Sequence, residues 1–275
     1  MLGKLMKHEF KNSWKILLPI NIGALLAGLV VGVFLYNMPI LEKLPEPLIV
    51  LLTFGFIGYC FLLAAAAILS LVFIVVRYYK SLYSAEGYLT FTLPATTTEI
   101  LSAKMLTGFI WEVINSICIM GSIFLAAGGS ALLAYKHYTM DLTIFLQDFT
   151  DVLDEVFSLN SIGAALFYLA VMLVNIALRL LTIFMAISLG QLWQEHKILG
   201  SVVFYFVINT VMGIISVFAN IGTGTFRMLF STSYFTSSGD FFFHTMTVGL
   251  IYSIIFCAAF YFASIYITDH KLNLD

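Results

Sequence analysis

Two charged side chains, Glu112 and Arg179, stand inside long apolar runs of the chain. A charge in the interior of a membrane costs about 2.5–3.5 kcal/mol on insertion scales, and such groups usually pair or line a wet cavity. At about 1.5 Å per residue, Glu112 lies some 12 Å along a helix from Lys104, and Arg179 some 18 Å from Gln191. Because these depths are similar, we expect a structural Glu112–Arg179 ion pair. The alternatives are a cavity-lining role and snorkelling to the interface.

Two asparagines accompany these charges. Asn115 and Asn175 each lie one helical turn deeper, on the same faces as Glu112 and Arg179. Side-chain amides in membrane spans hydrogen-bond across helices, so we expect the two amides to extend a polar network around the charges.

Motifs for covalent chemistry or metal binding are missing from the sequence. There is no GxxxxGK[ST] phosphate loop, no HExxH zinc helix and no GxSxG elbow. The three cysteines lie in apolar segments without a CxxC pair, which favours buried thiols over a disulfide or a metal site. We therefore expect no enzyme activity in this chain, no metal, and no cofactor bound by it.

The composition predicts a membrane protein, because apolar residues make up 61% of the chain and charged residues only 10%. Each of the six apolar segments is long enough for a helix to cross the hydrocarbon, which takes about 20 residues. These segments are approximately 16–36, 48–76, 105–134, 162–189, 198–221 and 245–267. The predicted fold is thus all-α and integral to the membrane, with residues 1–275 forming a single domain.

The positive charges predict the orientation of this domain. Nine lysines and arginines fall on the side that holds both termini (Lys4, Lys7, Lys11, Lys15, Arg77, Lys80, Lys104, Lys197, Lys271), against three on the other (Lys43, Lys136, Arg227). Since basic residues gather in cytoplasmic loops, both termini are expected to be cytoplasmic.

Residues 2–17 have the pattern of an amphipathic helix. Lysines recur at steps of three and four on one face, and the opposite face carries Leu2, Leu5, Met6, Phe10, Trp14 and Leu17. We expect an interfacial helix lying in the membrane surface, with its lysines toward anionic headgroups. The alternative is a solvated start to the first span.

The longest polar interruption on the cytoplasmic side is 77–104. Its residues that end and start helices have the pattern of a short docking element. Glu86-Gly87 is followed by Pro94, which ends any preceding helix, and Thr96 with Glu99 forms a capping box that starts the next. The order of these residues, ending in Ile100-Leu101 and Lys104, resembles the coupling segment between the second and third spans of type-2 ABC exporter permeases. The six-span layout resembles the same family over nearly the whole chain, and small bacterial peptide-resistance permeases in particular.

This resemblance implies a function. The chain would be a permease subunit in the bacterial plasma membrane, driven by a separate ABC ATPase subunit that binds ATP and Mg. It would pair with a second permease, identical or different, in contact with membrane lipid and not with nucleic acid. The ATPase-coupling residues that the resemblance implies are Ser84, Glu86, Gly87, Tyr88, Leu89, Phe91 and Leu93.

Small residues line one face of the first span, where Ala24, Gly28 and Gly32 recur at intervals of four. Such a face lets two helix backbones approach closely, which fits a subunit interface and packing within one chain equally well. The resemblance weakly favours the subunit interface, because the first span of family members commonly contacts the partner's fifth.

Two segments are expected on the external side. In 135–160, apolar residues fill one helical face, and the other is acidic, including Asp148, Asp151, Asp154 and Glu155. This face is either a solvated surface or a surface that collects cationic substrate. The segment 222–244 is rich in aromatics, which suits a re-entrant segment in the headgroup layer.

Three functions from different classes remain open. The first is an ABC exporter permease, whose first-guess substrate is an antimicrobial or other amphipathic peptide. The second is a non-transporting immunity or regulatory protein of the membrane, and the third is an intramembrane enzyme. The central segment, the N-terminal helix, the spans and the aromatic external segment together favour the permease.

Overall fold

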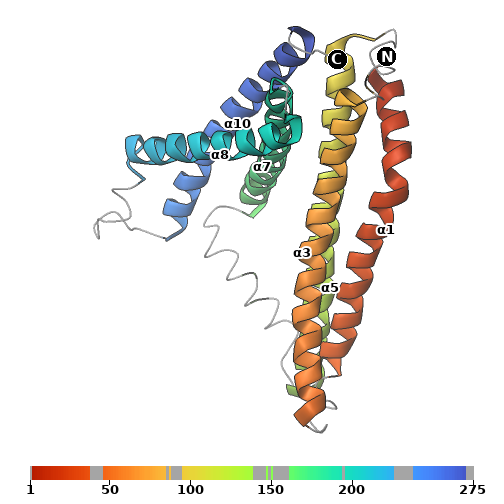
Figure 1. Cartoon of the computed structure of the whole chain (residues 1–275). Coiled ribbons are helices and arrows are strands. Elements are labelled where there is room, and N and C mark those ends of the chain that lie inside the picture. The colour runs from red at the N-terminus through yellow and green to blue at the C-terminus, as the bar shows by residue number, and fades with distance from the viewer. Residues whose placement is uncertain are drawn as a thin grey trace. The chain divides into compact units, whose positions relative to one another are not determined.

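The computed structural model describes residues 2–37, 46–84, 87, 95–138, 147, 150, 161–193, 196–225 and 238–270. Within these ranges the chain is helical, without a strand, as the sequence predicts. The long helices are α1 (Leu2–Tyr36), α3 (Glu46–Tyr83), α5 (Thr97–Tyr138), α7 (Ser161–Gly190), α8 (Lys197–Gly222) and α10 (Ser238–His270) (Figure 1). All six are long and apolar enough to cross a membrane, so the predicted six-span all-α architecture is confirmed.

The start of α5 is set by the predicted capping box. The backbone N–H of Thr96 donates to Glu99 Oε2 at 3.3 Å, and the N–H of Glu99 donates to Thr96 Oγ1 at 3.3 Å. These reciprocal bonds satisfy donors that the first turn of a helix leaves unpaired. The helix therefore begins at Thr97, directly after the proline-containing segment.

The helices group into two compact units. We call Lys7–Ile74 with Ile110–Asp151 the three-helix unit, and Met1–Met6 with Val75–Phe109 and Val152–Asp275 the carboxyl-terminal unit. The helices α3 and α5 each run from one unit into the other, and residues 84–96, which join them, belong to the carboxyl-terminal unit.

In the three-helix unit, α1 and α5 run parallel and α3 runs antiparallel to both. Contacts in order along the helices are Phe10–Trp111, Asn21–Asn115 and Ala24–Ser122 for α1 with α5, and Ser70–Asn115 and Tyr59–Ser122 for α3 with α5. This order is what three consecutive spans joined end to end require.

The small-residue face of α1 packs within the chain. Ala24, Gly28 and Gly32 are buried, and a Cβ added at Gly28 would collide with the backbone of Ser122 on α5. At Gly32 an added Cβ would collide with the carbonyl of Leu125, also on α5. The structure thus assigns this face to α1–α5 packing, because only residues this small allow the two backbones to approach so closely. The interpretation as a subunit interface is wrong for the side of α1 that these residues occupy.

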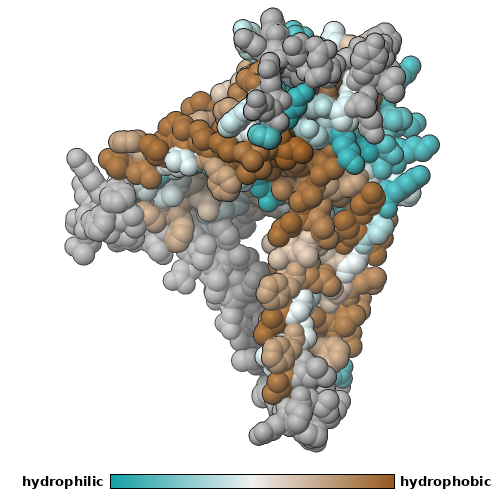
Figure 2. Space-filling model, viewed as in Figure 1, coloured by the Kyte–Doolittle hydropathy of each residue, from teal (hydrophilic) through white to brown (hydrophobic). Residues whose placement is uncertain are grey.

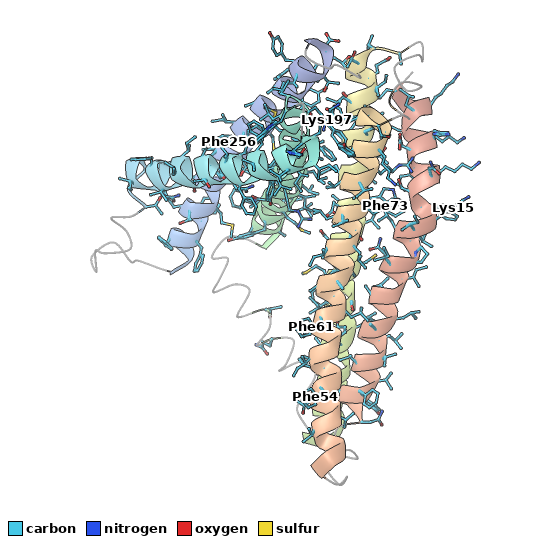
Figure 3. The ribbon with its side chains drawn as sticks, in the orientation of Figure 1. Lys15, Phe54, Phe61, Phe73, Lys197 and Phe256 are labelled. Carbon is cyan, nitrogen blue, oxygen red and sulfur yellow. The ribbon has the colours of Figure 1, made fainter. Side chains whose placement is uncertain are left out.

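The predicted interfacial helix at 2–17 also differs in the structure. The segment continues without a break into the first span, with Pro19 inside the helix. Ser13 and Leu17 belong to the buried stripe that continues along α1, and Phe10 stacks on Trp111 of α5 at 4.7 Å between ring centroids. Part of the apolar face that was expected to lie on lipid therefore packs on protein. The lysine face is exposed, and Lys15 extends away from α3 and α5 (Figure 3).

The long helices of the carboxyl-terminal unit are α7, α8 and α10. Contacts in order are Phe167–Phe243, Val174–Cys257 and Met185–Ser264 for α7 with α10, and Thr182–Met212 and Gly190–Ser201 for α7 with α8. The outer helices α7 and α10 therefore run in the same direction, and α8 turns back across α7 (Figure 1).

The boundaries of the external segments shift in the structure. The helix α10 begins at Ser238, so the aromatic run 241–243, which was expected in the re-entrant segment, lies in the first turns of α10, and Phe243 packs on Phe167 at 4.9 Å. Likewise α5 continues through Tyr138 into the predicted segment 135–160. Gly222 ends α8, and Gly224 in the following turn has φ of 78°, a conformation that glycine adopts without strain.

The surface of the helices is apolar over most of its visible length, with hydrophilic residues gathered near the N-terminal part of α1 (Figure 2). Large side chains such as Phe61, Phe206 and Phe218 are 72%, 65% and 68% exposed. Exposed apolar surface of this extent is costly in water and suited to hydrocarbon, so these side chains contact lipid.

We predict that Gly28→Leu destabilises the protein by about 1–3 kcal/mol, because the added side chain collides with backbone atoms of α5. Gly23→Leu is the matched control, since an added Cβ there meets nothing within 4 Å. The measurement is the free energy of unfolding in mixed detergent micelles together with the yield of monodisperse protein. Equal stability of the two variants would contradict close α1–α5 packing at Gly28.

Candidate functional site

One buried amide joins the three helices of the three-helix unit. The Nδ2 group of Asn115 on α5 donates to Asn21 Oδ1 on α1 and to Ser70 Oγ on α3, each at 2.9 Å. All three side chains are buried. Asn21 also donates its own Nδ2 to the carbonyl of Leu17 at 2.9 Å, so its amide is used from both ends. Asn115 therefore belongs to a polar network with Asn21 and Ser70, whereas a network around Glu112 and Arg179 stays a prediction.

A second polar contact lies two turns further along α5. The hydroxyl of Ser122 donates to the carbonyl of Ala24 at 2.7 Å, and it lies 2.9 Å from the hydroxyl of Tyr59 on α3. Since the Ser122 proton is used on α1, the Tyr59 hydroxyl is the donor between these two. The same three helices are therefore tied together at two levels, and such interhelical bonds contribute about 0.6–2 kcal/mol each in membrane proteins.

The two intramembrane charges lie in different compact units. Glu112 on α5 is 1% exposed and belongs to the three-helix unit, whereas Arg179 on α7 is exposed and belongs to the carboxyl-terminal unit. Asn175, one turn from Arg179, is also exposed, and its amide donates to the carbonyl of Val171 on its own helix at 2.8 Å. The Glu112–Arg179 pair stays a prediction.

A hydroxyl cluster forms where α3, α7 and α10 end. Tyr83, the last residue of α3, lies with its hydroxyl 2.8 Å from Ser188 Oγ of α7 and 3.3 Å from Thr268 Oγ1 of α10. All three side chains are buried in the carboxyl-terminal unit. The residue directly before 84–96 is therefore bonded to two further helices.

Aromatic packing surrounds this hydroxyl cluster. Tyr78 stacks on Phe184 of α7 with 4.0 Å between ring centroids, and it meets the edge of Tyr83 at 6.1 Å. Tyr78 is only 2% exposed, yet its hydroxyl has no hydrogen-bond partner among the described residues. Tyr78 and Tyr83 of α3 therefore both place a hydroxyl close to Ser188, but only the Tyr83 hydroxyl has the geometry of a hydrogen bond.

The residue directly after 84–96 is bonded to α10. Thr97, the first residue of α5, donates its hydroxyl to Asp269 Oδ1 at 3.0 Å. One turn later, Ser102 Oγ lies 2.8 Å from the hydroxyl of Tyr261. The last turns of α10 thus bond residues on both sides of 84–96.

Of the predicted ATPase-coupling residues, the structure describes Ser84 and Gly87. The N–H of Gly87 donates to the carbonyl of Ser84 at 2.7 Å, and the hydroxyl of Ser84 donates to the carbonyl of Lys80. A Cβ at Gly87 would collide with the backbone carbonyl of Leu82. Gly87 is therefore needed for a close approach within this chain, which the sequence did not predict. Glu86, Tyr88, Leu89, Phe91 and Leu93 lie outside the described residues.

The acidic residues Asp148, Asp151, Asp154 and Glu155 also lie outside the described residues. Where the structure does describe the chain, no group of three His, Cys, Asp or Glu side chains is placed to hold a metal ion.

Sequence reasoning missed Asn21, Ser70, Ser122 and the Tyr83–Ser188–Thr268 cluster. A signal existed for the first three, since each is a polar residue inside an apolar run, and such residues usually bond between helices. No local pattern distinguishes Tyr83 from Tyr78 or Tyr79.

The chain matches no protein-family model, no curated protein and no solved structure.

We predict that Asn115→Leu lowers the free energy of unfolding by about 1–3 kcal/mol, because it strands the buried acceptors of Asn21 and Ser70. Asn209→Leu on α8 is the control, since that amide is exposed and donates to the carbonyl of Tyr205 within its own helix. Unfolding of both variants in mixed micelles gives the comparison. If Asn115→Leu has the same free energy of unfolding as the control, the network does not stabilise the protein.

Proposed function

We propose that this chain is the transmembrane permease subunit of an ABC exporter in the bacterial plasma membrane, with both termini in the cytoplasm. A separate ATPase subunit binds ATP and Mg and supplies the energy. The proposal rests on the six membrane-spanning helices and on the resemblance of 77–104 to the coupling segment of type-2 exporter permeases. The distribution of basic residues supports the orientation.

The observation that carries the proposal is how the part of the coupling segment between α3 and α5, residues 84–96, is held at its two ends. Tyr83 at its start bonds Ser188 of α7 and Thr268 of α10, and Thr97 at its end bonds Asp269 of α10. A loop that served only to connect two spans needs no such attachments, since loops generally tolerate change. A segment that is displaced by a partner needs such attachments, because its displacement reaches other helices only through contacts that stay intact during the movement.

The mechanism that follows is mechanical, and the permease itself does no covalent chemistry. The ATPase closes on ATP and displaces the coupling segment. The displacement is passed to α3 and α5, which are continuous with the segment, and to α7 and α10, which are bonded to its ends. Because α3 and α5 run through both compact units, the displacement reaches both, and a path between two permeases changes the side to which it opens.

The substrate that we propose is an antimicrobial or other amphipathic cationic peptide, removed from the membrane. The support is the acidic face at 135–160, which is external in the proposed orientation and complementary in charge to such a peptide. The second permease is either another copy of this chain or a different one.

We predict that Glu86→Arg reduces copurification of the ATPase subunit at least tenfold, because an unfavourable charge contact at an interface costs several kcal/mol. Glu46→Arg makes the same charge reversal at the opposite end of α3, which the ATPase cannot reach in the proposed orientation. Bulky residues at Gly87 are unsuitable as probes, since they disturb the chain's own backbone.

The measurement is the amount of ATPase retained on the tagged permease, together with substrate-dependent ATP hydrolysis. Full retention and full coupling in Glu86→Arg would remove the segment as the docking site and the main support of the proposed function.

We predict that changing Asp148, Asp151, Asp154 and Glu155 together to Asn or Gln weakens capture of a cationic peptide, and most strongly at low salt. Exposed charges are screened over roughly 8 Å at physiological ionic strength, so an electrostatic contribution fades as salt is added. Peptide binding to the purified permease, measured across a salt series, checks this. If peptide binding by the variant responds to salt as it does in the wild type, the acidic face at 135–160 is only a solvated surface.

A further inference from the structure

The bonding of the Tyr83 hydroxyl is fixed by the number of available protons. Ser188 donates its proton to the carbonyl of Phe184 at 3.0 Å, and Thr268 donates its proton to the carbonyl of Ser264 at 2.8 Å. Both are therefore acceptors toward Tyr83, which has a single proton to give. The Tyr83–Ser188 contact of 2.8 Å is the stronger bond, and the 3.3 Å contact to Thr268 is the weaker one.

This arrangement makes the hydroxyl of Tyr83 dispensable for folding. If it is removed, Ser188 and Thr268 keep the bonds to their own helices, so no buried donor is left without an acceptor. The large penalty of a stranded polar group does not arise, and what is lost is the link between α3 and the two other helices. An experiment can therefore distinguish a tyrosine hydroxyl that is needed for folding from one that only links helices.

The aromatic ring of Tyr83 and its hydroxyl have separable roles as well. Leu82 and Leu101 are fully buried, and Tyr78 stacks on Phe184, so apolar packing at these helix ends is extensive without the hydroxyl. A phenylalanine at position 83 preserves the ring.

We propose that Tyr83 is the positioning residue that holds the coupling segment on α7 and α10. We call its hydroxyl contacts with Ser188 and Thr268 the latch. Displacement of 84–96 is passed to the last turns of these helices through its hydroxyl. The Thr97–Asp269 and Ser102–Tyr261 contacts hold the other end of the segment on the same stretch of α10. The latch is a property of this chain alone, whereas its use in coupling ATP hydrolysis to transport rests on the proposed function.

The test compares Tyr83→Phe with Tyr78→Phe. Both changes remove one buried tyrosine hydroxyl from the last turns of α3. The Tyr78 hydroxyl lies close to Ser188 and Tyr83 but lacks the geometry of a hydrogen bond, so it controls for a buried hydroxyl beside the cluster that does not link helices. The first measurement is amide hydrogen exchange of the purified permease in lipid nanodiscs, without any partner. Tyr83→Phe is expected to raise exchange in the last turn of α3 and of α10 and at Gly87 by about two- to tenfold, as the loss of one hydrogen bond implies. Tyr78→Phe is expected to leave these rates unchanged.

The second measurement is substrate-stimulated ATP hydrolysis by the complex with its ATPase. Tyr83→Phe is expected to retain the ATPase and its basal hydrolysis but to lose at least half of the stimulation by substrate. Tyr78→Phe and wild type are expected to behave alike.

The outcomes separate the latch from the proposed function. Equal exchange rates in Tyr83→Phe and Tyr78→Phe overturn the latch and leave apolar packing as what holds the segment. Raised exchange with full stimulation confirms the contact but overturns its role in transmission. If wild-type permease retains no ATPase, the proposed function fails, and the exchange measurement alone decides whether the latch exists.

Discussion

A polar group surrounded by hydrocarbon must find its partner inside the protein, and this constraint organises the structure more than any other. Many hydroxyl and amide side chains of the spans meet it locally, by donating to the carbonyl four residues earlier in the same helix, as Thr182, Asn209 and Thr247 do. The smaller set that bonds across helices, centred on Asn115, Ser122 and Tyr83, determines which helices are held together.

Close backbone approach complements these bonds. Gly28 and Gly32 bring α1 against α5, and the same approach places Ser122 within reach of the carbonyl of Ala24. The Ser122 bond therefore depends on the glycines, since a larger side chain on α1 would hold the two helices apart. In the carboxyl-terminal unit, Gly190 permits a similar approach of α7 to Ser201 of α8. Interhelical hydrogen bonds and small residues thus act together rather than as separate sources of stability.

The interhelical hydrogen bonds within the three-helix unit and those at the ends of α3 and α5 have different consequences for motion. The three-helix unit is tied at two levels along its length, which favours movement as one body. The ends of α3 and α5 are tied to α7 and α10 by a few hydroxyls close to a segment that contains Pro94. Such a junction suits the proposed coupling to a partner on one side of the membrane, since few bonds need to shift there.

The sequence by itself determined what depends on local chemistry. Hydropathy and length predicted six spans, and the spacing of Thr96 and Glu99 predicted the start of α5, because a helix cap is made by residues three positions apart. Only the tertiary structure decided that Ala24, Gly28 and Gly32 face α5, that 2–17 continues into the first span and packs on Trp111, and that Gly87 approaches Leu82. It also decided that Tyr83, and not Tyr78, is bonded to α7 and α10. A small face or a hydroxyl has the same pattern in sequence whatever lies opposite it, and its partner is chosen by helices distant along the chain.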